Sequence, residues 1–134
     1  MRAKGIDLSH WQGSFTYQGN IDFIIQKATE GWSWTDPKFE EFLPEVKKVP
    51  IRGAYHYFRT GFDAVAQAAH FWKTVKDHDF HFLVVDYEST NNILDRPGAE
   101  NLLKFWDKLG TLTDLPIVLY TNAYVLRDNL LICN

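Results

Sequence analysis

Apolar and polar positions along the chain alternate between two patterns. Short apolar segments, rich in β-branched and aromatic residues, are typical of strands. Between them, apolar residues recur at the three- and four-residue spacing of amphipathic helices. Repeated strand–helix alternation favours parallel strands joined by right-handed crossovers in a single α/β domain. The five predicted strands span residues 4–9, 23–29, 52–58, 82–85 and 116–121.

Start signals accompany the predicted helices. Asp36 followed by Pro37 is a typical N-cap and first helical residue, and Asp63 and Asn122 can cap two further helices. A fourth helix follows Pro97, and Gly110 is placed to end it. The residues expected to face the core are Phe39, Phe42, Leu43 and Val46; Val65, Ala68, Ala69, Trp72 and Val75; Leu102, Leu103, Trp106 and Leu109; and Ala123, Leu126 and Leu130.

Two carboxylates, Asp86 and Glu88, directly follow the most apolar predicted strand, which the pattern indicates is buried on both faces. Side chains alternate along a strand, so both should point to the same side. They lie at the strand's C-terminal end, where parallel α/β folds place active sites. Crowded carboxylates repel, so one should hold a proton near neutral pH, as glycosidic cleavage requires. The alternative is a structural pair that caps a helix or meets lysines.

Several predicted strands end in polar or aromatic side chains, which favours a barrel with one composite site. The first strand is not followed by a glycine-rich phosphate loop, which argues against a nucleotide-binding sheet. A complete eight-unit barrel needs roughly 200 residues or more, so 134 residues leave room for about five units. The strand-end residues are Asp7, Thr29, Tyr57, Asp86, Glu88 and Tyr120.

Composition narrows the function classes. Aromatic residues make up 16% of the chain; such an excess can belong to the core, or it can supply rings that stack on sugars. A net charge of −3 does not suggest nucleic-acid binding. There is no run of ~20 apolar residues to insert in a membrane and no signal-peptide core. The lone Cys133 permits no internal disulfide.

Histidines raise the question of a metal site. His70, His78 and His81 do not share a convincing face, so solvated or helix-end positions are the default expectation. Asp7 with His10 could indicate a metal-dependent deacetylase, but further histidines in strand context are missing. No metal and no other cofactor is therefore expected.

Five motifs, in order and covering nearly the whole chain, resemble glycoside hydrolase family 25, the Chalaropsis-type lysozymes. They are residues 5–13 (GIDLSHWQG), 25–31 (IQKATEG), 52–59 (RGAYHYFR), the Asp-x-Glu of residues 86–88, and 116–121 (PIVLYT). The resemblance implies an irregular TIM-like β/α barrel. It also implies hydrolysis of the β-1,4 bond between N-acetylmuramic acid and N-acetylglucosamine in bacterial peptidoglycan.

The resemblance implies roles for single residues. Glu88 would be the general acid, Asp86 its neighbour that steers the substrate's N-acetyl group, and Asp7 a third carboxylate in the pocket. Lys27 would either pair with one of them or lie in a buried ion pair, the second being favoured. The candidates for sugar contact are Tyr55, Tyr57 and Tyr120 on strands, and Trp11, Trp32 and Trp34 in loops near strand ends.

One departure from the family pattern concerns length. Family members continue past the fifth strand with three more strands and a late aspartate. Residues 1–134 are thus expected to be a single, incomplete catalytic domain, truncated after about five β/α units and able to self-associate through its open edge. The alternative function is a catalytically impaired, glycan-binding or partner-dependent fragment. The enzyme or the fragment is expected to act on the bacterial cell wall, outside the cell. It would reach the wall either as a phage endolysin or by non-classical export.

Overall fold

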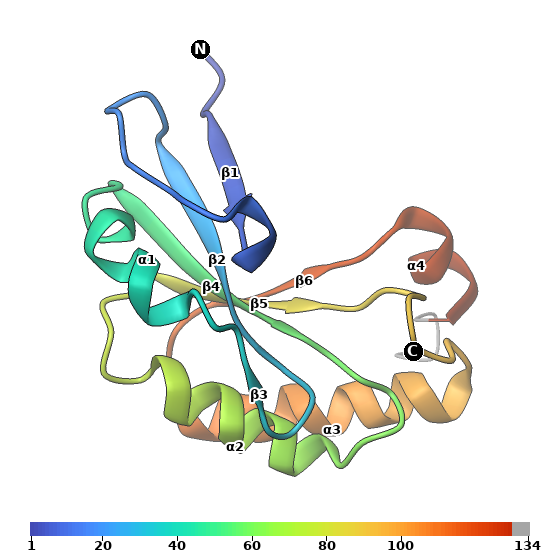
Figure 1. Ribbon diagram of the computed structural model, residues 1–134. Coiled ribbons are helices and arrows are strands. Elements are labelled where there is room, and N and C mark those ends of the chain that lie inside the picture. Colours follow the sequence, from blue (N-terminus) through green and yellow to red (C-terminus); the bar gives the residue numbers. More distant parts are fainter. Residues whose placement is uncertain (130–134) are drawn as a thin grey trace.

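The protein is described by a computed structural model that covers residues 1–129. Five strands lie parallel in one sheet, in the order in which they occur in the sequence (Figure 1). The predicted strands and their parallel arrangement are thereby confirmed. The strands are β1 (Gly5–Leu8), β2 (Phe23–Glu30), β4 (Ile51–Tyr57), β5 (Phe82–Asp86) and β6 (Ile117–Tyr120).

A sixth strand, β3 (Trp34–Thr35), pairs antiparallel with the end of β2. It is too short to show alternation in the sequence, so it was not predicted. Its pairing folds residues 31–35 back over the end of β2, beside α2 (Figure 1). This hairpin carries Trp32 and Trp34 to the carboxyl end of the sheet.

Four α-helices follow the later strands. They are α1 (Phe39–Val46), α2 (Ala64–Val75), α3 (Arg96–Leu112) and α4 (Ala123–Asn129). The first connection holds only a 3-10 turn, η1 (His10–Gln12), so the expected strand–helix alternation is wrong there. The helices α1, α2 and α3 cover one face of the sheet, and α4 lies beyond the end of β6 (Figure 1). Burial of their apolar side against the strands forms the single core.

The core contains a ring stack that joins α3 to the sheet. Phe105 of α3 lies parallel to His56 of β4 with ring centroids 4.9 Å apart, and meets Phe58 edge-on at 5.4 Å. All three side chains are fully buried. Residues that alternate along β5, such as Leu83 and Val85, point into this same layer.

The buried face of α2 differs from the predicted stripe. Val65 and Ala69 are exposed, whereas Gln67 and Phe71 are buried. The inward face is rotated because the Gln67 amide makes hydrogen bonds inside the protein, which a polarity pattern cannot anticipate. In α3, similarly, Leu103 is exposed and Phe105 takes the core position.

Helix ends also depart from prediction. Gly110 lies inside α3, which continues to Leu112. Asp36 does not cap α1; its side chain accepts a hydrogen bond from Lys38 N and the helix begins at Phe39.

Two other predicted caps are confirmed. Asp63 accepts a hydrogen bond from Ala66 N, and Asn122 accepts one from Val125 N.

The buried face of α4 also differs from the predicted one. Val125 is buried, while Ala123 and Leu126 are exposed. The predicted contact of Leu130 lies outside the described residues.

Within residues 1–129, no helix covers the second face of the sheet. The strands β1 and β6 are the two edges of the described sheet and do not pair with each other. Apolar side chains remain accessible on these edge strands, with Ile6 37% and Val118 46% exposed. The predicted barrel is therefore seen only as an open parallel sheet. None of the helices in this range has the length and apolarity needed to cross a bilayer.

A bulge in β2 decides which side chains face the uncovered side. Lys27 pairs with Tyr55 and Thr29 with the next residue, His56, so Ala28 is an extra residue. The bulge shifts the alternation by one, so that Lys27 and Glu30 point to the same side. Without it, Glu30 would face the helices.

Candidate active site

The three predicted carboxylates line one hollow on the uncovered face of the sheet, about 400 Å³ in volume. Asp7 comes from β1, Asp86 is the last residue of β5, and Glu88 follows it by two positions. The sheet register places Asp86 directly between Tyr57 and Tyr120 of the neighbouring strands. Parallel pairing thus brings the carboxylates together at the carboxyl edge of the sheet, as predicted.

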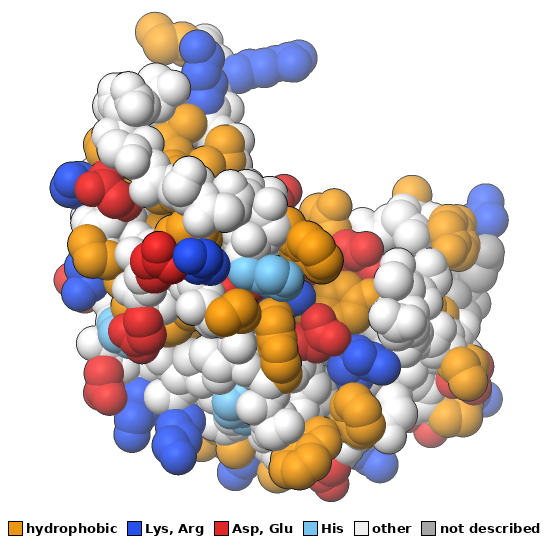
Figure 2. Space-filling view, in the orientation of Figure 1, with side chains coloured by type: hydrophobic (Ala, Val, Ile, Leu, Met, Phe, Trp, Pro, Cys, Tyr) orange, Lys and Arg blue, Asp and Glu red, His pale blue; other side chains and the backbone are white. Residues whose placement is uncertain are grey.

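A second, larger hollow of about 730 Å³ lies over the loops that follow the strands. Glu88 lines both hollows, so this residue lies where they meet. Figure 2 shows apolar, histidine and charged side chains gathered on this side of the molecule. The other residues that line the second hollow are His10, Trp11, Lys27, Glu30, Gly31, Trp32, Ser33, Trp34, Tyr57, Arg59, Phe62, Thr90 and Asn91.

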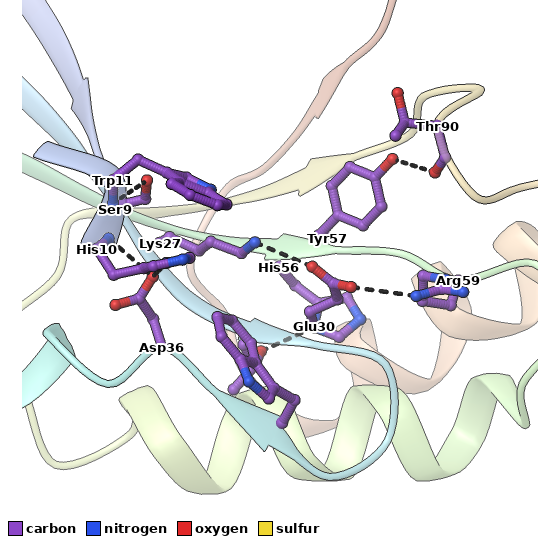
Figure 3. Close-up of polar contacts among 12 residues, drawn as sticks. Ser9, His10, Trp11, Lys27, Glu30, Asp36, His56, Tyr57, Arg59 and Thr90 are labelled. Atoms are coloured by element: carbon purple, nitrogen blue, oxygen red, sulfur yellow. Dashed lines mark hydrogen bonds and ion pairs between the residues drawn. The ribbon is translucent and has the colours of Figure 1, made fainter.

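The predicted sugar-contact residues divide between the two hollows. Tyr55 and Tyr120 line the first, whereas Tyr57 and Trp11 line the second. Tyr120 is 59% and Trp11 81% exposed, so both rings offer a free face. Tyr57 is held in place, because its hydroxyl donates to Thr90 O at 2.6 Å (Figure 3).

The Asp86 carboxyl is a perturbed acid. Burial, followed by the hydrogen bond to Glu88 and the charge of that residue, raises the pKa of Asp86 to about 8. Lys27 opposes this shift and Asp7 adds to it. One carboxyl oxygen, Asp86 Oδ1, is buried without a hydrogen-bond partner in the described part of the chain. The pair with Glu88 consequently keeps one proton at neutral pH, as the spacing predicts.

The same negative charges act on the tyrosines nearby. Burial and then the charges of Asp86 and Glu88 raise the pKa of Tyr57 to about 12. The pKa of Tyr55 is also raised, by burial first and by Asp86 and Asp7 next. Both phenols therefore remain neutral hydrogen-bond donors at any physiological pH.

A chain of ion pairs crosses the floor of the larger hollow. Lys27 Nζ lies 3.0 Å from Glu30 Oε1, and Arg59 Nη1 lies 3.2 Å from Glu30 Oε2 (Figure 3). The Lys27 ammonium also sits over the rings of Trp34 and Tyr57, at 4.9 and 5.5 Å from their centroids. Lys27 is thus a buried residue in an ion pair with Glu30, which was the favoured of the two predictions. The sequence did not single out Glu30 or Arg59, because only the β2 bulge turns Glu30 to this side.

Asp36 fixes the loop that presents Trp11. Its buried Oδ2 accepts from His10 N at 3.0 Å and lies 2.9 Å from His10 Nδ1 (Figure 3). The His10 ring packs against Trp11 at 4.5 Å and against Trp34 at 5.6 Å. An aspartate expected to cap a helix instead holds an aromatic wall.

A buried network of hydrogen bonds joins Thr29, His56 and Gln67 on the helix-covered side of the sheet. The Gln67 amide nitrogen donates to Arg59 O at 2.8 Å, so its oxygen is the acceptor for His56 Nε2 at 3.0 Å. His56 Nδ1 must then accept from Thr29 Oγ1, 2.7 Å away. Burial lowers the pKa of His56 to about 3, so the ring stays neutral. No sequence signal marked His56 or Gln67.

Potential metal ligands are dispersed. Across residues 1–129, no three His, Cys, Asp or Glu side chains are grouped so as to hold an ion. His70 contacts Trp34 O at 3.1 Å, and His81 Nδ1 accepts from Arg52 N at 3.0 Å. His78 lies beside Glu40, at 3.6 Å.

A parallel α/β sheet with paired acids at its carboxyl edge is a site of the kind that glycoside hydrolases use. The model of the family described as "Glycosyl hydrolases family 25" matches residues 6–133, and the chain belongs to that family. The autolytic lysozyme of Clostridium acetobutylicum is 31% identical over 134 residues, which are 95% of this chain and 40% of that protein. Lysozyme M1 of Streptomyces globisporus is 38% identical over 75 residues, 52% of this chain and 26% of that protein.

Solved structures share the fold. A family 25 glycosyl hydrolase from Bacillus anthracis superimposes with a TM-score of 0.84 at 24% identity, covering 94% of this chain and 63% of that one. A muramidase from Trichobolus zukalii gives a TM-score of 0.81 at 29% identity, covering 93% and 68%. The chain thus spans less than half of the two lysozymes and about two thirds of these structures.

Proposed function

We propose that this chain carries the catalytic carboxylates of a peptidoglycan hydrolase, an N-acetylmuramidase that cleaves the β-1,4 bond between N-acetylmuramic acid and N-acetylglucosamine. The observation that carries the proposal is the coupled pair of Asp86 and Glu88, which retains a proton and stands where two hollows meet. Family membership and the lysozyme names of the relatives support the substrate class. They do not favour the non-catalytic alternative.

Glu88 is the general acid in this proposal, because it is the carboxyl that reaches both hollows. Glu88 passes the proton that it shares with Asp86 to the glycosidic oxygen while the bond from that oxygen to the anomeric carbon breaks, and this transfer leaves both carboxyls charged. Water then adds to the anomeric carbon, and its proton returns to Glu88. Asp86 and Asp7 lie on the inner side, where Asp86 steers the N-acetyl group of the substrate and both acids stabilise the positive charge that develops on the sugar ring.

The aromatic walls would bind the sugars on either side of the broken bond. Trp11, Trp32 and Trp34 present accessible rings in the larger hollow, and apolar sugar faces stack on such rings. In the smaller hollow, Tyr55 and Tyr120 would take the same part. A glycan strand would therefore run from one hollow to the other across Glu88.

We infer that the open sheet is one side of an irregular TIM-like β/α barrel. Strands in sequential, parallel order with helices on one face are what a barrel requires, and the uncovered face would be its interior. Residues 1–134 would form a single unit of that domain. The enzyme would act at the bacterial cell wall, a proposal that the lysozyme name of the Clostridium relative supports.

The test is release of reducing ends from purified peptidoglycan by the chain and by Glu88→Gln. A general acid supplies about 10²–10⁴-fold, so Glu88→Gln should lose that factor in kcat. Glu100→Gln is the matched control, because Glu100 is exposed on α3, remote from both hollows. A Glu88→Gln variant as active as the control, or an inactive parent chain, would refute the proposal.

A further inference from the structure

The loop after β5, which carries Glu88, is tied to the loop after β4 by the side chain of Asn92. The Asn92 amide nitrogen donates to Glu88 O at 3.0 Å and to Phe58 O at 2.8 Å. Its oxygen accepts from Thr60 N at 2.9 Å. One amide therefore bonds to backbone groups of both loops, with a donor to each and an acceptor for the loop after β4.

Two further bonds close the loop that Asn92 spans. Asn92 N donates to Ser89 O at 3.0 Å, which makes residues 89–92 a turn. The Tyr57 hydroxyl donates to Thr90 O at 2.6 Å. Within this loop, Asn92 alone among the described side chains bonds to the backbone of Glu88 itself. On the other side of Glu88, Tyr87 N donates to Tyr120 O at 2.9 Å and Tyr87 O accepts from Thr121 Oγ1 at 2.7 Å. The Asn92 bond therefore anchors the peptide unit that follows Glu88.

We propose that Asn92 is a positioning residue that holds Glu88 against Asp86 at the junction of the two hollows. Glu88 lies outside β5, so the sheet hydrogen bonds that fix Asp86 do not extend to it. Orientation of a reacting group has to be supplied by the protein, and a misplacement of about 1 Å can cost about 10²-fold in rate. The proposal rests on the proposed function, in which Glu88 is the general acid.

Asn101 of α3 provides a comparison within the same structure. Its amide nitrogen donates to Thr60 O at 3.2 Å and to Phe62 O at 2.8 Å. Both side chains therefore tie down the loop after β4, Asn92 through Phe58 O and Thr60 N and Asn101 through two backbone carbonyls. Only Asn92 reaches Glu88, so Asn101→Ala controls for loosening of that loop.

The first measurement is independent of activity. Carboxyl carbon NMR of Asp86 follows the proton that it shares with Glu88, with the charges of Asp7 and Lys27 as the other contributors. In Asn92→Ala the Glu88 carboxyl is no longer held against Asp86, so the apparent pKa of Asp86 should fall below the parent value. In Asn101→Ala it should match the parent. If Asn92→Ala titrates like the parent, the positioning role is wrong.

The second measurement is kcat and KM on soluble peptidoglycan fragments. Asn92→Ala should lower kcat about 10- to 100-fold with KM within about twofold, since only transition-state geometry is lost. Asn101→Ala should keep kcat within about threefold of the parent. Equal losses in both variants would overturn the proposal. If Asn92→Ala fails to fold, Asn92→Ser, which keeps one donor, should show the same changes at smaller size.

The two measurements separate two failures. A parent chain that shows the raised Asp86 pKa but no hydrolysis would refute the proposed function. The change in titration between Asn92→Ala and Asn101→Ala would still decide the positioning role.

Discussion

The raised pKa of Asp86 makes a prediction about stability as well as about chemistry. At neutral pH the folded chain holds a proton on the Asp86–Glu88 pair that an unfolded aspartate, with a pKa of 3.8, does not hold. Raising the pH through about 8 removes that proton and leaves two charges crowded together in a partly buried site. Because the folded state binds more protons than the unfolded state below this value, the free energy of unfolding must fall as pH rises.

The size of the loss follows from the same pKa. The pKa of Asp86 is about 8 in the folded chain and 3.8 in the unfolded chain. This difference lowers the free energy of unfolding by about 2 kcal/mol between pH 6.5 and pH 9. Solvent screening at this partly exposed carboxyl reduces the expected loss to about 1 kcal/mol. The folded pKa of Tyr57, raised to about 12, lies outside this window. His56 has a pKa of 6.5 when unfolded and about 3 when folded, so it raises the free energy of unfolding by about 0.4 kcal/mol between pH 6.5 and pH 9. The comparison of a variant that lacks the Asp86 carboxyl with a control that keeps it cancels this contribution and reports the pair.

The perturbation is Asp86→Asn, which removes the titrating carboxyl while keeping its shape. Urea unfolding at pH 6.5 and pH 9 should show the loss in the parent chain and in the control Asp107→Asn, an exposed position on α3. Asp86→Asn should lose about 1 kcal/mol less than the control. An equal loss in Asp86→Asn and Asp107→Asn would refute the inference that this pair shares a proton.

Two further predictions concern the neighbours of the pair and the uncovered sheet. Lys27→Met removes the positive charge that lowers the pKa of Asp86, so the Asp86 carboxyl resonance should titrate above the parent value. Lys48 lies in an exposed pair with Glu45, so Lys48→Met should leave the pKa of Asp86 unchanged. An identical titration in both variants would exclude an influence of Lys27. The 134-residue chain should self-associate, because its edge strands leave Ile6, Val118 and Tyr120 exposed. Light scattering measures the association. A monomeric chain that melts cooperatively and does not bind an apolar dye would contradict this prediction.

Much of the fold was predictable because the strands carry their signal locally. Residues 82–85 are apolar and partly β-branched, and they form the largely buried strand β5, as expected. Asp86 and Glu88 could be placed together because strand alternation is a property of the backbone, whatever surrounds it.

What could not be predicted depends on contacts between distant segments. Gln67 looks like a surface residue of α2, yet it is buried because Arg59 and His56 satisfy its amide. The extra residue at Ala28 depends on how β2 pairs with β4, so the side of the sheet to which Glu30 points was not readable either. Asn92 bonds to Phe58 and Thr60, more than thirty residues away, and resembles any loop asparagine in sequence.

The most direct test of the central claim is the chemical identity of the new chain end. Peptidoglycan digested by the chain is reduced with borodeuteride, and the labelled sugar is identified by mass spectrometry. Cleavage by a muramidase frees the anomeric carbon of N-acetylmuramic acid, so the label should appear on muramic acid, and Glu88→Gln should reduce it by about 10²–10⁴-fold in rate. Label on glucosamine alone, or none above that of a protein-free digest, would contradict the account.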